Sequence, residues 1–204
     1  MVKHEKDQTT EQKIHAAAKQ IFIEKGMAGA RMQDIADRAG INKALLHYYF
    51  RNKEKLFETV FVEAAANFLP RVKSIIAGDG PLFEKIEKFV HEYISILIDN
   101  PYLPLFILNE VNKQPKTFIT KIWGDKRPPF QVLALQVDAE VKKGTIKPID
   151  AMTLMVNMVS MCIFPFVARP MVQYATGISD EAFWQFMERR KTEVSKFIID
   201  SIRK

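Results

Sequence analysis

The chain has 204 residues, 48% of them hydrophobic, which is enough to fill the core of one large domain or two small ones. Its single cysteine, Cys162, excludes an internal disulfide framework and any multi-cysteine zinc or iron–sulfur site. The net charge of +6 permits an anionic partner without identifying one. Because cysteine is scarce and the charged N-terminal sequence lacks the apolar segment of a secretory signal, we expect a cytoplasmic protein.

Helical periodicity recurs along the chain and no segment alternates as a strand would, so we predict an all-α fold of about nine helices. Residues 2–8 are polar and are expected to form a frayed tail. A capping box formed by Thr9 and Gln12 then opens the first helix, which carries apolar residues at helical spacing and stops at Gly26.

Residues 32–57 contain two short amphipathic segments joined by a tight turn, which is the pattern of a helix-turn-helix. The second helix is expected at residues 32–39. Gly40 can take the left-handed conformation that ends it, and Asn42 can cap a third helix at residues 43–50. Six lysines and arginines against three acidic residues give residues 31–55 a net charge of +3, which is half of the excess charge of the chain.

A long fourth helix is expected to start at Lys53, with Asn52 as its cap, and to link the two halves of the chain. The later helices are predicted at residues 81–98, 102–111, 115–123, 130–143, 152–168 and 180–203, with Asp150 and Ser179 capping the last two. The apolar run at residues 152–168 is shorter than the ~20 residues of a membrane span and contains polar residues and a proline. We therefore expect a buried helix there and no membrane partner.

The third helix meets the requirements of a recognition helix, which presents short or polar side chains to base edges and is flanked by phosphate donors. Lys43 could reach a guanine edge or a phosphate, and Ala44 is small enough to touch a thymine methyl group. Tyr49 either packs inward, contacts phosphate, or does both. The alternative to DNA binding is that this helix covers a core and its basic side is only exposed to solvent. The candidate DNA-binding residues are Arg31, Gln33, Asn42, Lys43, Ala44, His47, Tyr48, Tyr49 and Lys53.

The same segment resembles the N-terminal module of the tetracycline-repressor (TetR) family of transcriptional regulators. The resemblance covers about residues 9–57. It rests on Asp34-Ile35-Ala36, Ala39-Gly40-Ile41, Leu46, Tyr49-Phe50, Lys53-Glu54 and Leu56-Phe57.

Four positions depart from the family pattern. Asn42 replaces the common serine cap and Ala44 the common glycine. His47 stands where a tyrosine usually contacts phosphate, so the strength of this contact would depend on protonation near neutral pH. Arg31 stands where the family has threonine, which loses a helix cap but offers a stronger phosphate partner.

The resemblance implies a three-helix DNA-binding domain at residues 1–57 and a helical ligand-binding and dimerisation domain at residues 58–204. It also implies a homodimer in which residues 150–167 and 180–203 of two subunits pack as a four-helix bundle. The expected function is that of a regulator, most simply a repressor, which leaves a palindromic operator when a small molecule binds.

The second domain carries many aromatic and methionine residues, which either fill a helical core or line a cavity for an apolar or amphipathic effector. The candidate effector residues are Phe68, Phe89, Tyr93, Phe106, Trp123 and Met155.

Catalytic and metal sites are not expected. The four histidines are not spaced with carboxylates as metal ligands, and there is no glycine-rich phosphate loop or nucleophile elbow, so we predict no enzyme activity, metal or cofactor. Two rival functions remain open. One is a helical module that binds small molecules or proteins but not DNA, and the other is a basic amphipathic protein at membrane surfaces.

Overall fold

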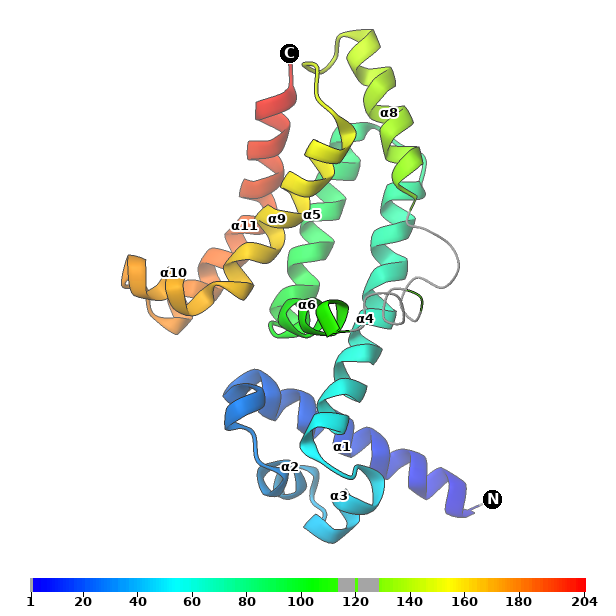
Figure 1. Cartoon of the computed structure of the whole chain (residues 1–204), viewed down its shortest axis with the longest axis vertical. Helices are drawn as coiled ribbons and strands as arrows, with labels where there is room; N and C mark the ends of the chain where they lie inside the picture. Colours follow the sequence, from blue (N-terminus) through cyan, green and yellow to red (C-terminus); the bar gives the residue numbers. More distant parts are fainter. Residues whose placement is uncertain (1, 114–119, 121–128) are drawn as a thin grey trace. The chain divides into compact units, whose positions relative to one another are not determined.

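The computed structural model describes residues 2–113, 120 and 129–204. Within these ranges α-helix is the regular secondary structure, together with an isolated β-bridge between Ile146 and Arg203, and the all-α prediction is confirmed. The ten described helices are α1 (Val2–Gly29), α2 (Met32–Ala39), α3 (Lys43–Tyr49), α4 (Lys53–Ala77), α5 (Leu82–Asp99), α6 (Leu103–Lys113), α8 (Phe130–Lys143), α9 (Ala151–Val167), α10 (Arg169–Thr176) and α11 (Asp180–Ile202) (Figure 1). The helix predicted at residues 115–123 lies outside the described residues.

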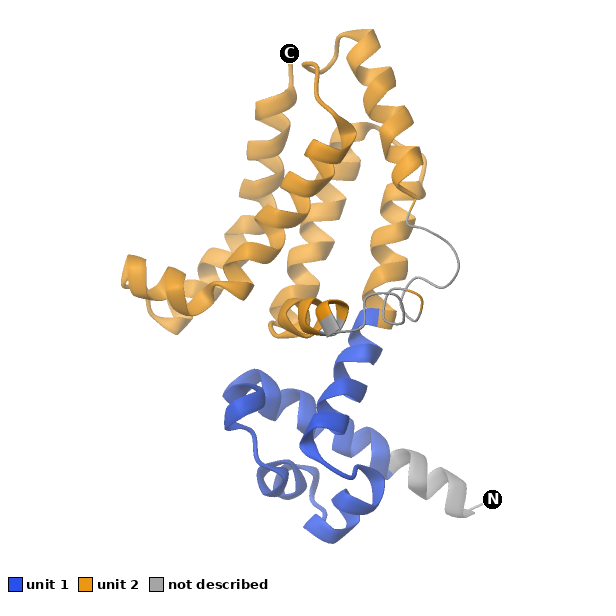
Figure 2. Ribbon diagram, in the orientation of Figure 1, with its two compact units in different colours: residues 1–65 blue, residues 66–204 orange. Residues whose placement is uncertain are grey.

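The chain divides into two compact units, residues 1–65 and residues 66–204 (Figure 2). The division falls within α4, so one continuous helix contributes residues to both units. Each unit has its own buried apolar residues.

In the first unit, α1 begins at Val2, so the prediction of a frayed tail at residues 2–8 was wrong. These residues contain neither glycine nor proline, and nothing in them opposes a helix. The predicted break at Gly26 is confirmed, because its φ of 67° and ψ of 173° lie outside the helical region, in a conformation that only glycine adopts readily.

The core of the first unit forms where α1 meets α2 and α4. The Phe22 ring packs edge-on against Phe57, with ring centroids 4.9 Å apart, and Phe57 lies 4.4 Å from Phe61. Two ion pairs join α1 to α2: Lys25 binds Asp34 at 2.7 Å, and Arg38 binds Glu24. These contacts fix α2, and with it the turn that leads into α3.

In the second unit, α5 packs along α11, and α9 packs against both helices. A polar network surrounds the buried Lys85 near the start of α5. The Lys85 ammonium donates to the Gln136 side chain at 2.8 Å, and the Gln136 amide donates to the Gly80 carbonyl at 2.7 Å. Since Gln136 belongs to α8, the network fastens this helix to the α4–α5 turn.

The apolar helix α9 is buried along one side, and the buried residues include Leu154, Met158, Cys162 and Phe166. Among the described residues, no single helix has both the length and the apolar character of a membrane span. The pair α9 and α10 satisfies these criteria only together, across a bend of 75°.

Candidate nucleic-acid interface

The turn between α2 and α3 has the geometry that its sequence predicts. Gly40 is left-handed (φ 68°, ψ 33°), and the Ile41 N–H donates to the Ala36 carbonyl at 3.0 Å, as in a Schellman motif. The Asn42 side-chain oxygen accepts a hydrogen bond from the Leu45 N–H at 2.7 Å, which caps α3. The start of α3 is therefore fixed by local backbone and side-chain bonds.

The helix α3 has one buried side and one exposed side. Leu46 and Phe50 point into the core, whereas Lys43, Ala44 and His47 are exposed. The Tyr48 side chain is 83% exposed, and its ring packs edge-on against Tyr49, which is half-buried, at 5.6 Å. A tyrosine this exposed contributes little to the core, so the outer side of α3 is available for a partner.

The six cations between positions 31 and 55 are not equally available. Arg38 is paired with Glu24, and Lys55 is paired with Glu58 at 2.7 Å. Within the described part of the chain, the side chains of three cations form neither a hydrogen bond nor an ion pair. These are Arg31, Lys43 and Arg51.

Lys53 occupies an intermediate position. Its half-buried ammonium donates to the Ala30 carbonyl at 3.1 Å, which ties the start of α4 to the connection between α1 and α2. An ammonium has three N–H donors, so this bond leaves two for another acceptor. Nearby, the Asn52 oxygen accepts from the Lys55 N–H at 2.8 Å, and the predicted cap of α4 is confirmed.

Arg31 and Gln33 lie at the start of α2. The Arg31 backbone N–H bonds to the Asp34 carboxylate, which forms one half of a capping box, and the Arg31 side chain remains exposed. A hydrogen bond from Lys25, with smaller contributions from Arg31, lowers the pKa of Asp34. The Gln33 amide donates to Asp37 at 2.7 Å, so a DNA contact by this side chain would have to replace or share that bond.

The His47 ring is oriented by the backbone. Its Nδ1 lies 3.3 Å from the Arg51 carbonyl oxygen, which can only accept, so this contact requires a proton on Nδ1. Nε2 is then the nitrogen left for another partner. Two exposed neighbours of this surface were not among the predicted residues: Leu45, which is 37% exposed, and Arg51. Leu45 lies three residues before Tyr48, and Arg51 directly follows Phe50. This spacing could have identified both residues as neighbours of the surface from the sequence.

Three of the candidate effector residues form an aromatic cluster. The Tyr93 ring packs edge-on against Phe68 at 4.7 Å and lies 5.3 Å from Phe89. Burial raises the pKa of Tyr93, and nearby Cys162 raises it further. Phe106 is buried and Met155 is half-buried. Trp123 lies outside the described residues.

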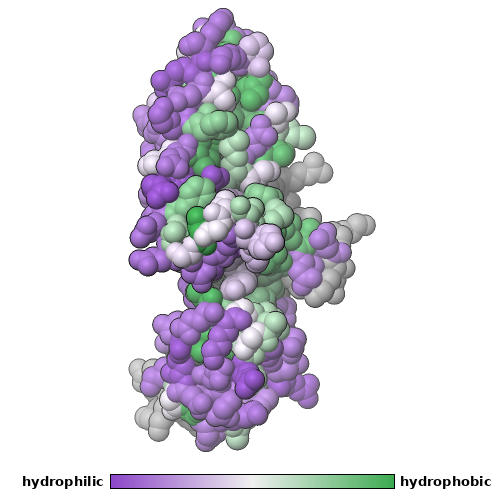
Figure 3. Space-filling model, turned by 90° about the vertical axis from the view of Figure 1, so that its left-hand side faces the viewer, coloured by the Kyte–Doolittle hydropathy of each residue, from purple (hydrophilic) through white to green (hydrophobic). Residues whose placement is uncertain are grey.

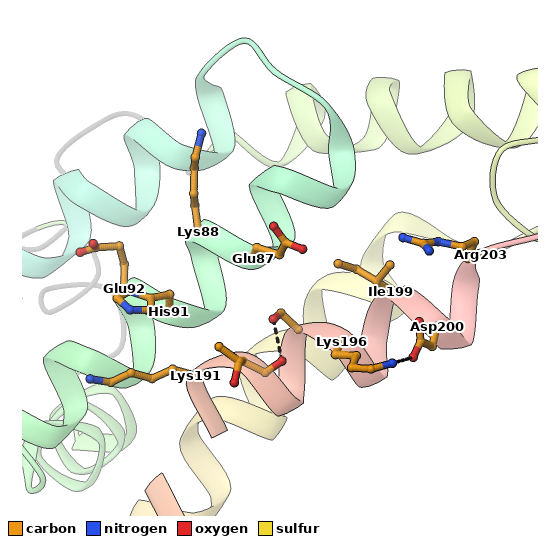
Figure 4. A pocket seen from close by; sticks show the side chains of 11 residues that line it. Glu87, Lys88, His91, Glu92, Lys191, Lys196, Ile199, Asp200 and Arg203 are labelled. Carbon is orange, nitrogen blue, oxygen red and sulfur yellow. Dashed lines mark hydrogen bonds and ion pairs between the residues drawn. The ribbon is translucent and has the colours of Figure 1, made fainter. Parts of the chain in front are cut away.

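A separate groove of about 620 Å³ lies between α5 and α11 (Figure 4). Most of its lining is charged, and it includes none of the candidate effector residues. Three of its lysines are already paired with carboxylates, among them Lys191 with Glu188 at 2.7 Å and Lys196 with Asp200. The groove therefore has the chemistry of a solvated surface. Among the described residues, no group of histidine, cysteine or acidic side chains is placed to hold a metal ion.

Comparisons with known proteins agree with this geometry. Residues 14–60 match the family described as "Bacterial regulatory proteins, tetR family". The transcriptional regulator RutR of Escherichia coli is 26% identical over 192 residues, which cover 93% of this chain and 89% of RutR.

Solved structures share the fold over nearly the whole chain. Bacillus subtilis FadR in complex with stearoyl-CoA aligns with a TM-score of 0.59 and 18% identity, covering 95% of this chain and all of that one. A ketosteroid transcriptional regulator of Mycobacterium tuberculosis aligns with a TM-score of 0.66 and 14% identity, covering 94% and 93%. The family match over the helix-turn-helix and the full-length relative together identify a DNA-binding transcriptional regulator, and its N-terminal module is that of the tetR family.

Proposed function

We propose that the protein is a homodimeric repressor that binds a palindromic operator through α3 and leaves it when a small apolar or amphipathic effector binds. The observation that carries this proposal is the outer side of α3. It combines exposed Lys43, Ala44, His47 and Tyr48 with a buried inner side that holds the helix in place. Residues 1–57 would carry the DNA contacts and residues 58–204 the effector and dimer contacts.

On this proposal the side chains divide into base readers and phosphate contacts. Lys43 and Ala44, on the first turn of α3, would face base edges in the major groove. Arg31, His47 and Lys53 would donate to phosphates on both sides of the groove, with Gln33, Tyr48 and Tyr49 in support. Asn42 would act indirectly. Its side-chain oxygen accepts from the Leu45 N–H, and this cap fixes the start and direction of α3.

A two-fold dimer would present two copies of α3 to two half-sites of the operator. Exposed apolar side chains on α9 and α11 support a dimer through these helices. They are Met152, Val156, Phe164 and Phe197, each more than half exposed in the single chain. Water-exposed apolar side chains that lie along two neighbouring helices are typical of a surface covered by a partner.

The cluster of Phe68, Phe89 and Tyr93 supports an effector site in the second unit. Tyr93 is half-buried, and burial raises the pKa of its hydroxyl. Its hydroxyl would give one polar contact in an aromatic environment. The stearoyl-CoA bound by B. subtilis FadR, a protein of the same fold, is an amphipathic ligand of this kind.

Release from DNA would follow from a population shift. An effector that binds more tightly to a conformation with the wrong separation of the two α3 helices lowers DNA affinity by its differential binding to the two states. The helix α4 is the covalent element shared by the two units, and it carries both Lys53 and Phe68. It is therefore the element through which we expect the coupling to act.

Selection of bound sequences from random duplex DNA tests the proposal. The expected result is an enriched palindrome, followed by release of that duplex when fatty acids, acyl-CoAs or other amphipathic metabolites are added. Failure to enrich any sequence would favour a helical binding module without DNA function. Enrichment without release by any ligand would leave operator binding in place and remove the effector part of the proposal.

A further inference from the structure

The helix α10 is unusual because it covers no core. The chain bends by 75° between α9 and α10, and none of the eight residues from Arg169 to Thr176 is buried. In Figure 1 α10 projects beyond the packing of α5, α9 and α11. Figure 3 views that side of the molecule and shows hydrophobic side chains exposed among polar ones at mid-height.

Despite this exposure, α10 is firmly attached at its base. The Arg169 guanidinium binds Asp180 at 2.8 Å and stacks over the rings of Trp184 and Phe183, at 4.6 and 5.1 Å from their centroids. The Gln173 amide also donates to Asp180, at 2.6 Å, and these two bonds, Gln173 first, lower the pKa of that carboxyl. An isolated helix of eight residues is marginal in water, so these contacts stabilise it in this place.

The attached helix presents two large side chains to solvent. Met171 is 58% exposed and Tyr174 is 91% exposed, and their spacing of three residues places them on one side of α10. Phe164, near the end of α9, is 54% exposed. Since Phe164 is already part of the proposed dimer surface, the exposed apolar residues of α10 continue that surface beyond the bend.

We propose that α10 is an arm that packs against a second copy of this chain through Met171 and Tyr174. This inference rests on the proposed homodimer. In a two-fold dimer each arm would make the same contact with the opposite subunit, so Met171 and Tyr174 of both subunits would contribute to the interface. A rigid attachment favours such a role, because an arm fixed in advance loses little conformational entropy on binding.

The area of exposed apolar surface supports a second copy as the occupant. With about 200 Å² for a fully exposed large side chain, Met152, Val156, Phe164 and Phe197 expose roughly 450 Å² per chain. Met171 and Tyr174 add roughly 300 Å². The total approaches the roughly 800 Å² per partner that a stable interface of standard size buries.

The experiment uses the full chain and two readouts. In the first, Met171→Ser combined with Tyr174→Ser is compared with Leu135→Ser, which changes a side chain on α8 that is 72% exposed. We expect the double variant to raise the dimer dissociation constant at least about tenfold in sedimentation, and the control variant to leave it unchanged. Circular dichroism should show equal helix content in all three, since none of the changed residues is buried.

In the second readout, Tyr174 is replaced by photoreactive p-benzoylphenylalanine. Irradiation should give a covalent dimer, which the same replacement at Leu135 should not give. If the unaltered protein is dimeric but the double variant has the same dissociation constant, the arm is overturned while the proposed function stands. A protein that stays monomeric at ~100 µM and off DNA would overturn both the arm and the proposed dimer. Cross-links only to other proteins or to lipid would also overturn the arm.

Discussion

The position of Lys53 leads to a quantitative prediction about DNA binding. Its ammonium is held against the Ala30 carbonyl at 3.1 Å and keeps two N–H donors for a phosphate. Each phosphate contact contributes about 0.9 to the slope of log K against log salt, so Lys53→Ala should reduce the slope of a dimer by about 1.8. If the effect vanishes near 1 M salt, this slope corresponds to a loss of affinity of about 30-fold at ~0.15 M.

Lys55→Ala is the matched control. Lys55 lies two residues along the same helix, but its ammonium is paired with Glu58 at 2.7 Å across one helical turn. Its removal should change the slope by much less than that of Lys53. Both variants should be assayed by fluorescence anisotropy on the selected duplex, from 50 to 400 mM KCl, well below their melting temperatures. The precaution matters because the loss of the Ala30 bond should lower stability by about 1 kcal/mol.

Two results would refute the reasoning. If Lys53→Ala keeps the slope of the unaltered protein, its ammonium serves only to tie α4 to Ala30. If Lys55→Ala reduces the slope equally, the ion pair with Glu58 does not make that lysine unavailable, and the division of the cations by their internal partners fails.

Four further predictions follow from the described side chains. Lys43→Ala should relax base preference at one position of each half-site in a repeated selection, whereas equal losses on all sequences would remove its base-reading role. Asn42→Ala should lower the free energy of unfolding by about 1 kcal/mol in denaturant titrations, because it removes the cap on Leu45, and an unchanged midpoint would contradict this. His47→Ala should weaken binding to all duplexes alike, because it removes a phosphate contact and no base contact, and a loss confined to some sequences would contradict this role. Burial raises the pKa of Cys162 to about 12, so its alkylation at pH 8 should be slow until the protein unfolds. The thiol keeps its proton longer in the folded state, so its contribution to stability is complete below about pH 8.5 and declines as the pH rises further, which fast labelling of the native protein at pH 8 would disprove.

Features set by neighbouring residues could be predicted from the sequence. Gly40 takes the left-handed conformation, and Asn42, Asp150 and Ser179 each cap the helix that follows. Each of these depends on a hydrogen bond spanning three to five residues, for which composition and spacing are sufficient. The division of α3 into a buried and an exposed side is likewise periodic, and Leu46 and Phe50 are buried as the pattern indicates.

Features that depend on distant residues or on proline placement could not be predicted. Pro170 suggests an irregular segment in the sequence, but it lies in the first turn of α10, where a missing N–H costs nothing. The bond from Lys53 to Ala30 joins residues 23 apart, and that from Lys85 to Gln136 joins residues 51 apart. No local sequence pattern indicates which lysine or arginine will form a hydrogen bond or ion pair within the protein.

This internal use of cations changes the electrostatic argument for DNA binding. The sequence alone offers six positive side chains between positions 31 and 55, but Arg38 and Lys55 are paired with Glu24 and Glu58. Arg31, Lys43 and Arg51 remain, together with the two free donors of Lys53. Even if Lys43 contacts a phosphate instead of a base edge, these four lysines and arginines neutralise at most about eight phosphates in a dimer, and their contribution to the salt slope should not exceed about −7. A steeper slope would require cations from another part of the chain.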